Sequence, residues 1–541
     1  MDDKSSIFVR KSTGFVREAS FLDAAVFTAC FSAPVGATIA FGILWALGAF
    51  PGTNMILATI LSVALDLPIL IMMALMASSM PRTGGDYVWV SRIMSPPIAV
   101  VSNFAAALSA LIGAAYWARI WSSMGIGPAM TILGNLLKSD ALIRIGASAG
   151  TTVWTYFAGI FLILVMTLAL ASGTKRMFKV QNWFFGIAMA GTLLAFAVMA
   201  FGSRSSFVTN FNQFAQPFTK LGDSYAGIME AAKGAGLALG TKANFWVTTL
   251  PTVGCIMTFM MWNFWSVYLA GEMKGAGNRS RQLSVMITAL IWDAGFIILG
   301  VLLLYSIAGQ DFVRSINYLS TAAPTKYLLP VAPYFNLFAG MVTKNPLVSS
   351  LIGISFVFWN LPAMVGNCFM PVRTVFAWAF DRVLPEKLSE VNERTHSPVP
   401  AIILVMAIVA LIMTWSTFSS SFFTLLSMGV MCGVIVIAIV GVAAIIFPFK
   451  RSEMYRSSPA NVQFLGMPLV SIMGVLSIGV MALLVYLLMR FPSLGITSPR
   501  LVVLFIVSVI AVGLAIYYIA RVVQRKRGID IDLAYRELPP E

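Results

Sequence analysis

The chain is poor in the residues from which most enzymes and metalloproteins build their sites. It has one histidine, His396, and four cysteines, and the cysteines all lie inside apolar segments. Metal centres and redox sites need clusters of His, Cys and carboxylate groups, and disulfide scaffolds need paired cysteines. No HExxH, CxxC, phosphate-binding glycine loop or serine-elbow motif is present. We therefore predict that the protein is not an enzyme and that it holds no cofactor or metal.

Charged residues are also scarce. They make up 11% of the 541 residues, against about 25% in an average soluble domain. Hydrophobic residues make up 59%, which indicates an all-α integral membrane protein whose partner is the lipid bilayer. The net charge of +15 could indicate nucleic acid, but Lys and Arg lie between the apolar segments and not along one face. This placement argues against a nucleic-acid partner.

The apolar runs predict twelve transmembrane helices. They lie near residues 22–49, 53–79, 97–122, 151–172, 181–202, 246–270, 283–308, 347–380, 399–417, 421–447, 467–489 and 500–521. The predicted regions are an N-terminal tail (1–20), five spans (21–202), a long outer connection (203–245), five more spans (246–447), the last two spans (448–521) and a C-terminal tail (522–541). Short helices are expected in 203–245 and in a second outer connection, 309–346. The oligomeric state is left open.

The distribution of basic residues predicts the orientation. Most Lys and Arg residues fall on one side of the membrane if both termini are cytoplasmic. Because basic residues accumulate in cytoplasmic loops, we predict this orientation, in the cytoplasmic (plasma) membrane.

The first span carries a break at its centre. Pro34 lacks a backbone N–H and clashes with the preceding turn, and Gly36 weakens the helix two residues later. Non-helical backbone inside a bilayer is tolerated only where protein or a cavity surrounds it, and many transporters use such breaks as substrate sites. A simple proline kink is the alternative. The sixth span has a similar polar interruption at Trp262 and Asn263, for which an aromatic packing cluster is the alternative.

Three motifs follow the second, sixth and eighth spans. The pattern Pro-x-x-Gly-Gly-x-Tyr is found at Pro81, Gly84, Gly85 and Tyr87. A variant of Glu-x-x-Lys-Asn-Pro-x-Arg, with an insertion and no proline, is found at Glu272, Lys274, Asn278 and Arg279. The pattern Arg-x-x-x-Ala-x-x-x-Asp-x-x-Leu-Pro is found at Arg373, Ala377, Asp381, Leu384 and Pro385, and Ser397-Pro398 follows it. In these motifs the chain resembles the amino acid–polyamine–organocation superfamily of permeases, over roughly residues 15–450.

The resemblance implies a fold and a mechanism. The fold would be the LeuT type, a 5+5 inverted repeat in which helices 1 and 6 are discontinuous. The protein would be a secondary active transporter, an amino acid permease that works by alternating access. The substrate would bind at the two breaks, which contain Ser32, Pro34, Val35, Gly36, Ala37, Thr38, Phe259, Trp262, Asn263, Phe264 and Trp265.

The breaks also suggest the substrate class. Free N–H groups at the start of a half-helix attract a carboxylate, and free carbonyls at the end of the preceding one suit an ammonium group. Pro34 replaces a residue that could donate in many members of the superfamily, and the pocket is thereby reshaped. Neither break contains Asp or Glu, so we predict a neutral or apolar amino acid. A polyamine or other organocation permease is one alternative, and a transporter-like sensor or channel is another.

Charged residues within and beside the spans suggest how transport is coupled and gated. Asp66 in span 2 and Asp293 in span 7 occupy equivalent spans of the two repeats and are candidates for coupling to H+ or Na+. Carboxyl groups that merely tie helices together are the alternative. A cytoplasmic gate could be formed by Asp23, Arg92, Arg373 and Asp381. Solvated side chains, or side chains that bind lipid headgroups, are the alternative to a gate.

Overall fold

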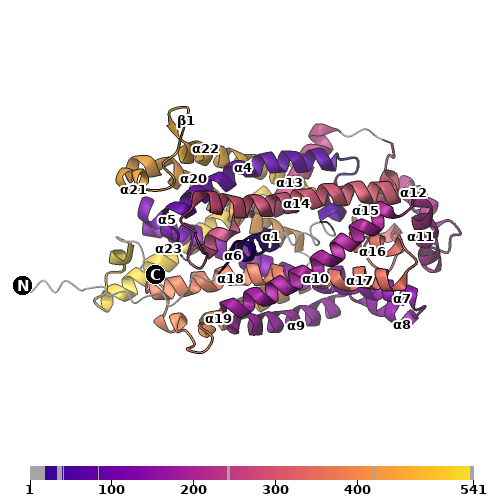
Figure 1. Cartoon of the computed structure of the whole chain (residues 1–541), viewed down its shortest axis with the longest axis horizontal. Coiled ribbons are helices and arrows are strands. Elements are labelled where there is room, and N and C mark those ends of the chain that lie inside the picture. The colour runs from indigo at the N-terminus through magenta and orange to yellow at the C-terminus, as the bar shows by residue number, and fades with distance from the viewer. Residues whose placement is uncertain are drawn as a thin grey trace, which may run out of the picture.

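The structure is a computed structural model that describes residues 19–32, 39, 42–82, 84–240, 244–419, 422–496 and 498–535. Long helices run side by side along the longest axis of the molecule (Figure 1). Eleven helices within the described ranges are long and apolar enough to cross a membrane. They contain α4 (Met55–Ser79), α6 (Pro96–Trp121) with α7 (Gly127–Leu136), α9 (Thr152–Ala171), α10 (Thr174–Phe201), α13 (Leu250–Met260), α14 (Arg279–Ala308), α17 (Pro346–Phe356) with α18 (Asn360–Phe380), α19 (Val399–Phe418), α20 (Phe422–Lys450), α22 (Leu469–Arg490) and α23 (Pro499–Lys526).

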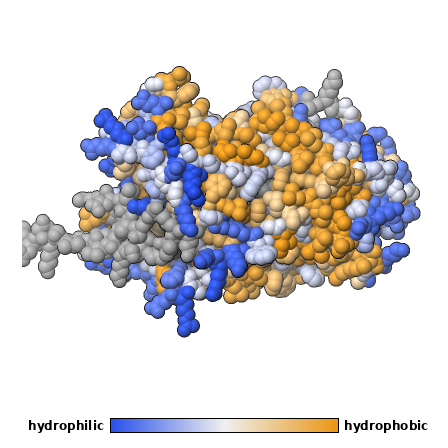
Figure 2. Space-filling model, viewed as in Figure 1, coloured by the Kyte–Doolittle hydropathy of each residue, from blue (hydrophilic) through white to orange (hydrophobic). Residues whose placement is uncertain are grey.

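The surface of the bundle is apolar around its middle. Figure 2 shows a broad hydrophobic band on the visible face, with polar residues gathered at both ends of the long axis. Large apolar side chains on the long helices are strongly exposed, among them Phe157 (66%), Leu168 (72%) and Leu411 (69%). Exposure on this scale would be unfavourable in water. It is the pattern expected of a multi-pass protein whose helices face lipid.

The two ends of the bundle differ in their connections. One end carries α5 (Asp86–Ile93), η6 (Glu386–Ser389), α21 (Ser452–Arg456), the antiparallel strands β1 (Gln463–Phe464) and β2 (Met467–Pro468), and η8 (Ile531–Tyr535). We call it the predicted inner end. The opposite end, the predicted outer end, carries α8 (Asp140–Ser148), α11 (Arg204–Thr219) and α12 (Ser224–Gly234) (Figure 1).

Helices are present in both long outer connections, as predicted. Besides α11 and α12, they are α15 (Gln310–Ala322), η5 (Pro324–Lys326) and α16 (Phe335–Met341). Phe207 on α11 packs edge to face on Phe312 of α15 and on Phe338 of α16. The two connections therefore form one packed layer over the outer end.

The predicted first span contains two short helices, α1 (Phe21–Ser32) and α3 (Ile43–Ala49). The predicted break, from Pro34 to Thr38, lies outside the described residues. Gly48 allows α3 to lie against α15, because a Cβ at this position would collide with the Thr321 side chain. The first span is thus packed against the outer layer through its second helix.

The sixth span is interrupted, as predicted. The α-helix α13 ends at Met260, a turn covers residues 261–264, and a 3-10 helix, η4 (Trp265–Leu269), follows. Two side chains donate hydrogen bonds to backbone carbonyls near the end of α13. Trp262 Nε1 donates to the Thr258 carbonyl at 3.0 Å, and Asn263 Nδ2 donates to the Met260 carbonyl at 3.0 Å. These bonds supply partners that a continuous helix would otherwise provide.

Three other spans differ from their predicted outlines. The third, predicted to end at 122, continues through a π-helical turn, η2 (Ser122–Ile126), into α7. The eighth, predicted as one segment, is divided between α17 and α18. Pro128 and Pro362 follow the two irregular turns, and proline disturbs the helical turn before it because it lacks an N–H and clashes with the carbonyl four residues earlier. The fifth, predicted from 181, begins at Thr174.

Candidate functional site

A small cavity lies at the centre of the bundle, between α1, α6, the sixth span, α18 and α20. Its volume is about 40 Å³, and its described lining residues are Phe31, Ser109, Ile112, Gly113, Tyr116, Trp117, Thr258, Phe259, Trp262, Asn367, Leu426, Gly429 and Val430. Pockets for small molecules usually measure about 300–1,000 Å³. A ligand larger than a few water molecules therefore requires these walls to move apart.

Aromatic rings form the wall between the first and sixth spans. Phe31, near the end of α1, stacks on Trp265 with ring centroids 3.5 Å apart and an interplanar angle of 11°. Trp262 packs edge to face against both rings, at 5.8 Å from Phe31 and 5.6 Å from Trp265. Gly433 on α20 makes room for this indole, because a Cβ there would collide with the Trp262 ring. The three rings therefore join the end of α1 to the sixth span.

The residues predicted to bind substrate do not all lie at this cavity. Phe259 and Trp262 line it. Phe264 and Trp265 are fully buried but are not among its described lining residues, and Asn263 is buried beside Asp66. Ser32 is the last residue of α1, and its side chain is not described. The remaining predicted residues lie outside the described ranges: Pro34, Val35, Gly36, Ala37 and Thr38.

Several lining residues were missed by the sequence analysis. Ser109, Ile112, Gly113 and Tyr116 follow one face of α6 at the i, i+3, i+4, i+7 spacing, and this signal could have identified them. Asn367 on α18 approaches α6 at Gly113, where a Cβ would collide with its amide. Its Nδ2 donates to the Ala363 carbonyl at 2.9 Å.

The two membrane carboxyl groups lie within electrostatic range of one another, and one of them lies beside the break in the sixth span. Asp66 on α4 and Asp293 on α14 are both buried, and their charges act on one another. Asn263 lies beside Asp66, and Cys30 of α1 lies near Asp293. The two acids thus have neighbours in both the first and the sixth spans.

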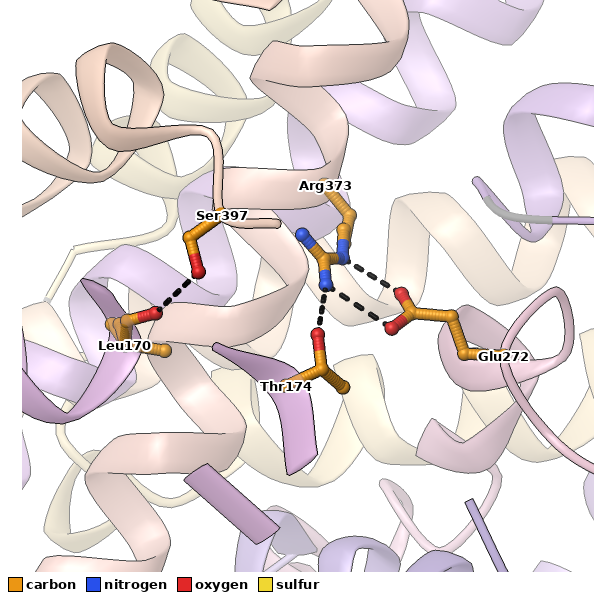
Figure 3. Close-up of polar contacts among 5 residues, drawn as sticks. All are labelled: Leu170, Thr174, Glu272, Arg373 and Ser397. Atoms are coloured by element: carbon orange, nitrogen blue, oxygen red, sulfur yellow. Dashed lines mark hydrogen bonds and ion pairs between the residues drawn. The ribbon is translucent and has the colours of Figure 1, made fainter. Parts of the chain in front are cut away.

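A buried ion pair lies toward the inner end of the sixth span and α18. Figure 3 shows Arg373 of α18 and Glu272 facing one another, with Thr174 below them. Arg373 Nε donates to Glu272 Oε1 at 2.8 Å, and Nη2 donates to Glu272 Oε2 at 3.1 Å and to Thr174 Oγ1 at 2.9 Å. Arg373 is 5% exposed and Glu272 is 2% exposed. Ser397 donates to the Leu170 carbonyl nearby, at 3.3 Å.

The backbone of Glu272 also binds the segment before α1. The Ala19 amide donates to the Glu272 carbonyl at 3.0 Å, and the Lys274 amide donates to the Ala19 carbonyl at 3.1 Å. Together with the ion pair, these bonds connect the first span, the sixth span, α10 and α18. Glu272 is the first residue of the second sequence motif, but it was not predicted as a gate residue.

The four predicted gate residues lie in three separate clusters. Arg373 belongs to the ion pair just described. Asp23 accepts hydrogen bonds from the Ser20 amide at 2.8 Å and from Asn182 Nδ2 at 2.6 Å. Asp381 accepts from the Tyr87 hydroxyl at 3.0 Å, and Arg92 lies 5.7 Å from the ring centroid of Tyr535, which contacts Tyr87. Each cluster joins a different set of elements at the inner end.

Asp86, at the start of α5, is a buried acid outside the spans. It is 1% exposed, and burial raises its pKa to about 6, although hydrogen bonds from Ser102 (2.5 Å) and Asn103 (3.1 Å) favour the charged form. Because the pKa of Asp86 is higher in the folded state than in the unfolded state, its contribution to stability depends on pH. The contribution is fully present below the unfolded pKa of 3.8 and is lost as pH rises through about 6.

Replacing Asp86 should therefore flatten the pH dependence of stability. From pH 4 to pH 7 the wild type is expected to lose about 2 kcal/mol of stability through this group. Asp86→Asn should not lose this contribution, and thermal unfolding in detergent across this pH range measures the difference. Asp223→Asn is the control of opposite sign, because hydrogen bonds, first that from the Ala226 amide, lower the pKa of Asp223. Equal pH profiles for wild type and Asp86→Asn would contradict the expectation.

Comparison with known proteins identifies the family. The family described as amino acid permease matches residues 20–517, from just before α1 to within α23. No curated protein matches the chain. The match covers nearly the whole sequence, and it confirms the resemblance carried by the three motifs. This multi-pass membrane protein therefore belongs to the amino acid permease family.

Proposed function

We propose that the protein is a secondary active transporter that carries a neutral or apolar amino acid across the cytoplasmic membrane by alternating access. The observation that supports this substrate class is the lining of the central cavity. None of its described lining residues is charged, and most are aromatic, aliphatic or glycine. A cationic substrate enclosed there would need a carboxylate partner, because an unpaired buried charge is costly.

The proposed arrangement is the 5+5 inverted repeat with both termini cytoplasmic. In it, α1 and α3 together form the first span and complete twelve. Carbonyls at the end of α1, near Phe31 and Ser32, would accept from the substrate ammonium group. The substrate carboxylate would bind at Gly36, Ala37 and Thr38. The apolar side chain would lie against Trp262 and Phe259, which line the cavity.

Coupling to protons is proposed for Asp66 and Asp293. Two buried carboxyl groups whose charges act on one another are costly to ionise together, so the binding of one proton to the pair is favoured. The pair adjoins Asn263 in the sixth-span break and Cys30 in α1. A substrate-driven movement of either span would change the environment of the pair, and proton uptake would thereby be linked to substrate binding.

Uptake into proteoliposomes tests both parts. With an acidic exterior, wild-type protein is expected to accumulate leucine above its external concentration and to leave putrescine outside. Asp66→Asn should lose accumulation driven by the pH gradient, by about tenfold or more, and should retain exchange of leucine for leucine. Asp140→Asn, at the exposed start of α8, is the control and should behave as wild type.

Each other outcome contradicts a defined part of the proposal. Accumulation of putrescine in place of leucine would overturn the neutral substrate. Equilibration without accumulation would indicate a channel or facilitator. Unchanged accumulation by Asp66→Asn would remove the coupling role of Asp66.

A further inference from the structure

A second cavity, larger than the central cavity, lies at the inner end. Its volume is about 550 Å³, and it lies between α1, the first turns of α10 and the connection that follows η4. Its described lining residues are Asp23, Lys175, Phe178, Lys179, Asn182, Trp183 and Lys274. Three lysines face one acid there, so the lining carries a positive charge.

The acid is already engaged by neighbouring groups. Asp23 accepts from Ser20 and from Asn182, and the charge of Lys274 acts on its carboxylate. Lys175 and Lys179 lie one turn apart on α10 and are exposed. Within the described residues, neither lysine forms an ion pair or a hydrogen bond with another side chain. The cavity therefore offers ammonium groups whose charge the described protein does not neutralise.

The position of the cavity indicates the source of the anion. Trp183 in its wall is 65% exposed, and it is followed on α10 by exposed Ile187 and Leu193. These residues lie on a helix that is apolar enough to cross the membrane. Trp and Lys residues are commonly found at the depth of the lipid headgroups. Basic pockets between transmembrane helices on the cytoplasmic side bind anionic headgroups.

We infer that this cavity binds the phosphate-bearing headgroup of an anionic phospholipid, and that Lys175, Lys179 and Lys274 are its ligands. The acyl chains would lie along the exposed apolar side of α10. The headgroup would compete with Asp23 for Lys274, which adjoins the backbone bonds between Ala19 and the Glu272 segment. Occupancy would therefore act on the contacts that hold α1 at the inner end.

Lipid binding by the full-length protein tests the inference. Native mass spectrometry in detergent would count molecules of dioleoyl phosphatidylglycerol retained by wild type and by the triple variant Lys175→Gln, Lys179→Gln, Lys274→Gln. We expect the triple variant to bind this lipid at least about tenfold more weakly, because each lysine near an anionic lipid surface contributes appreciably to the binding free energy. The matched control removes three exposed basic residues elsewhere at the inner end, with Arg525→Gln, Lys526→Gln and Arg527→Gln, and should bind as wild type.

Three further measurements identify the ligand and its place. Phosphatidylglycerol with brominated chains should quench wild-type fluorescence more than it quenches Trp183→Phe, and dioleoyl phosphatidylcholine should be retained weakly. Inorganic phosphate should not raise the unfolding temperature of the wild type through the three lysines. Any shift it causes should be the same in the triple variant. A lysine-dependent shift with phosphate would make this a site for a soluble anion and would overturn the lipid assignment. Equal phosphatidylglycerol binding by the triple variant and the control would overturn the site.

Discussion

Glu272→Gln is expected to destabilise the protein by about 3–5 kcal/mol, because it leaves the buried Arg373 guanidinium without its carboxylate. Arg373 would keep its bond to the Thr174 hydroxyl, and its guanidinium carbon lies 4.5 Å from the Phe369 ring centroid; both contacts are with uncharged groups. The inner end should also open more readily, since Glu272 joins the sixth span to α18. Thermal unfolding in detergent and leucine accumulation in proteoliposomes measure the two effects.

An exposed ion pair at the same end provides the control. Arg382 Nε lies 3.1 Å from Glu386 Oε1, and the two side chains are 32% and 67% exposed. Glu386→Gln should therefore cost less than about 1 kcal/mol. The double variant Glu272→Gln, Arg373→Gln should recover part of the stability lost in Glu272→Gln, because it also removes the buried guanidinium charge. If the double variant loses the sum of the two single losses, the two residues do not act as a pair.

Trp262→Ala is expected to enlarge the central cavity and to change which substrates are preferred. The indole is buried between Phe31, Trp265 and α20, and its removal should cost about 3–5 kcal/mol of stability. The space it leaves should favour a bulky substrate such as phenylalanine over alanine, relative to wild type. Competition of each amino acid with labelled leucine measures this ratio.

Trp89→Ala separates the effect on selectivity from the loss of stability. Trp89 on α5 is fully buried, donates to the Met80 carbonyl at 3.1 Å and lies away from the cavity. Its truncation should lower stability by a similar amount and leave the ratio unchanged. A ratio that shifts equally in both variants would mean that Trp262 does not shape the substrate site.

Much of the fold could be predicted because it follows from local properties of the chain. A run of about 20 apolar residues must form a helix in a bilayer, where every backbone polar group needs a partner. Among the described residues, eleven of the predicted spans are therefore present as apolar helices. The sixth-span break was predictable for the same reason, since Trp262 and Asn263 interrupt an apolar run. The three motifs predicted the family.

The composition and order of the chain thus determined a multi-pass permease of the amino acid family, and its helices to within a few residues at most boundaries. Only the tertiary structure decided which of the candidate residues meet. It paired Glu272 with Arg373, placed Asp66 beside Asn263, and lined the cavity with Ser109, Gly113 and Asn367. These contacts join helices that are far apart in sequence, and the rotation of each helix about its axis selects which side chains face inward. Hydropathy leaves that rotation undetermined when nearly every residue of a span is apolar, because core and lipid then favour the same side chains.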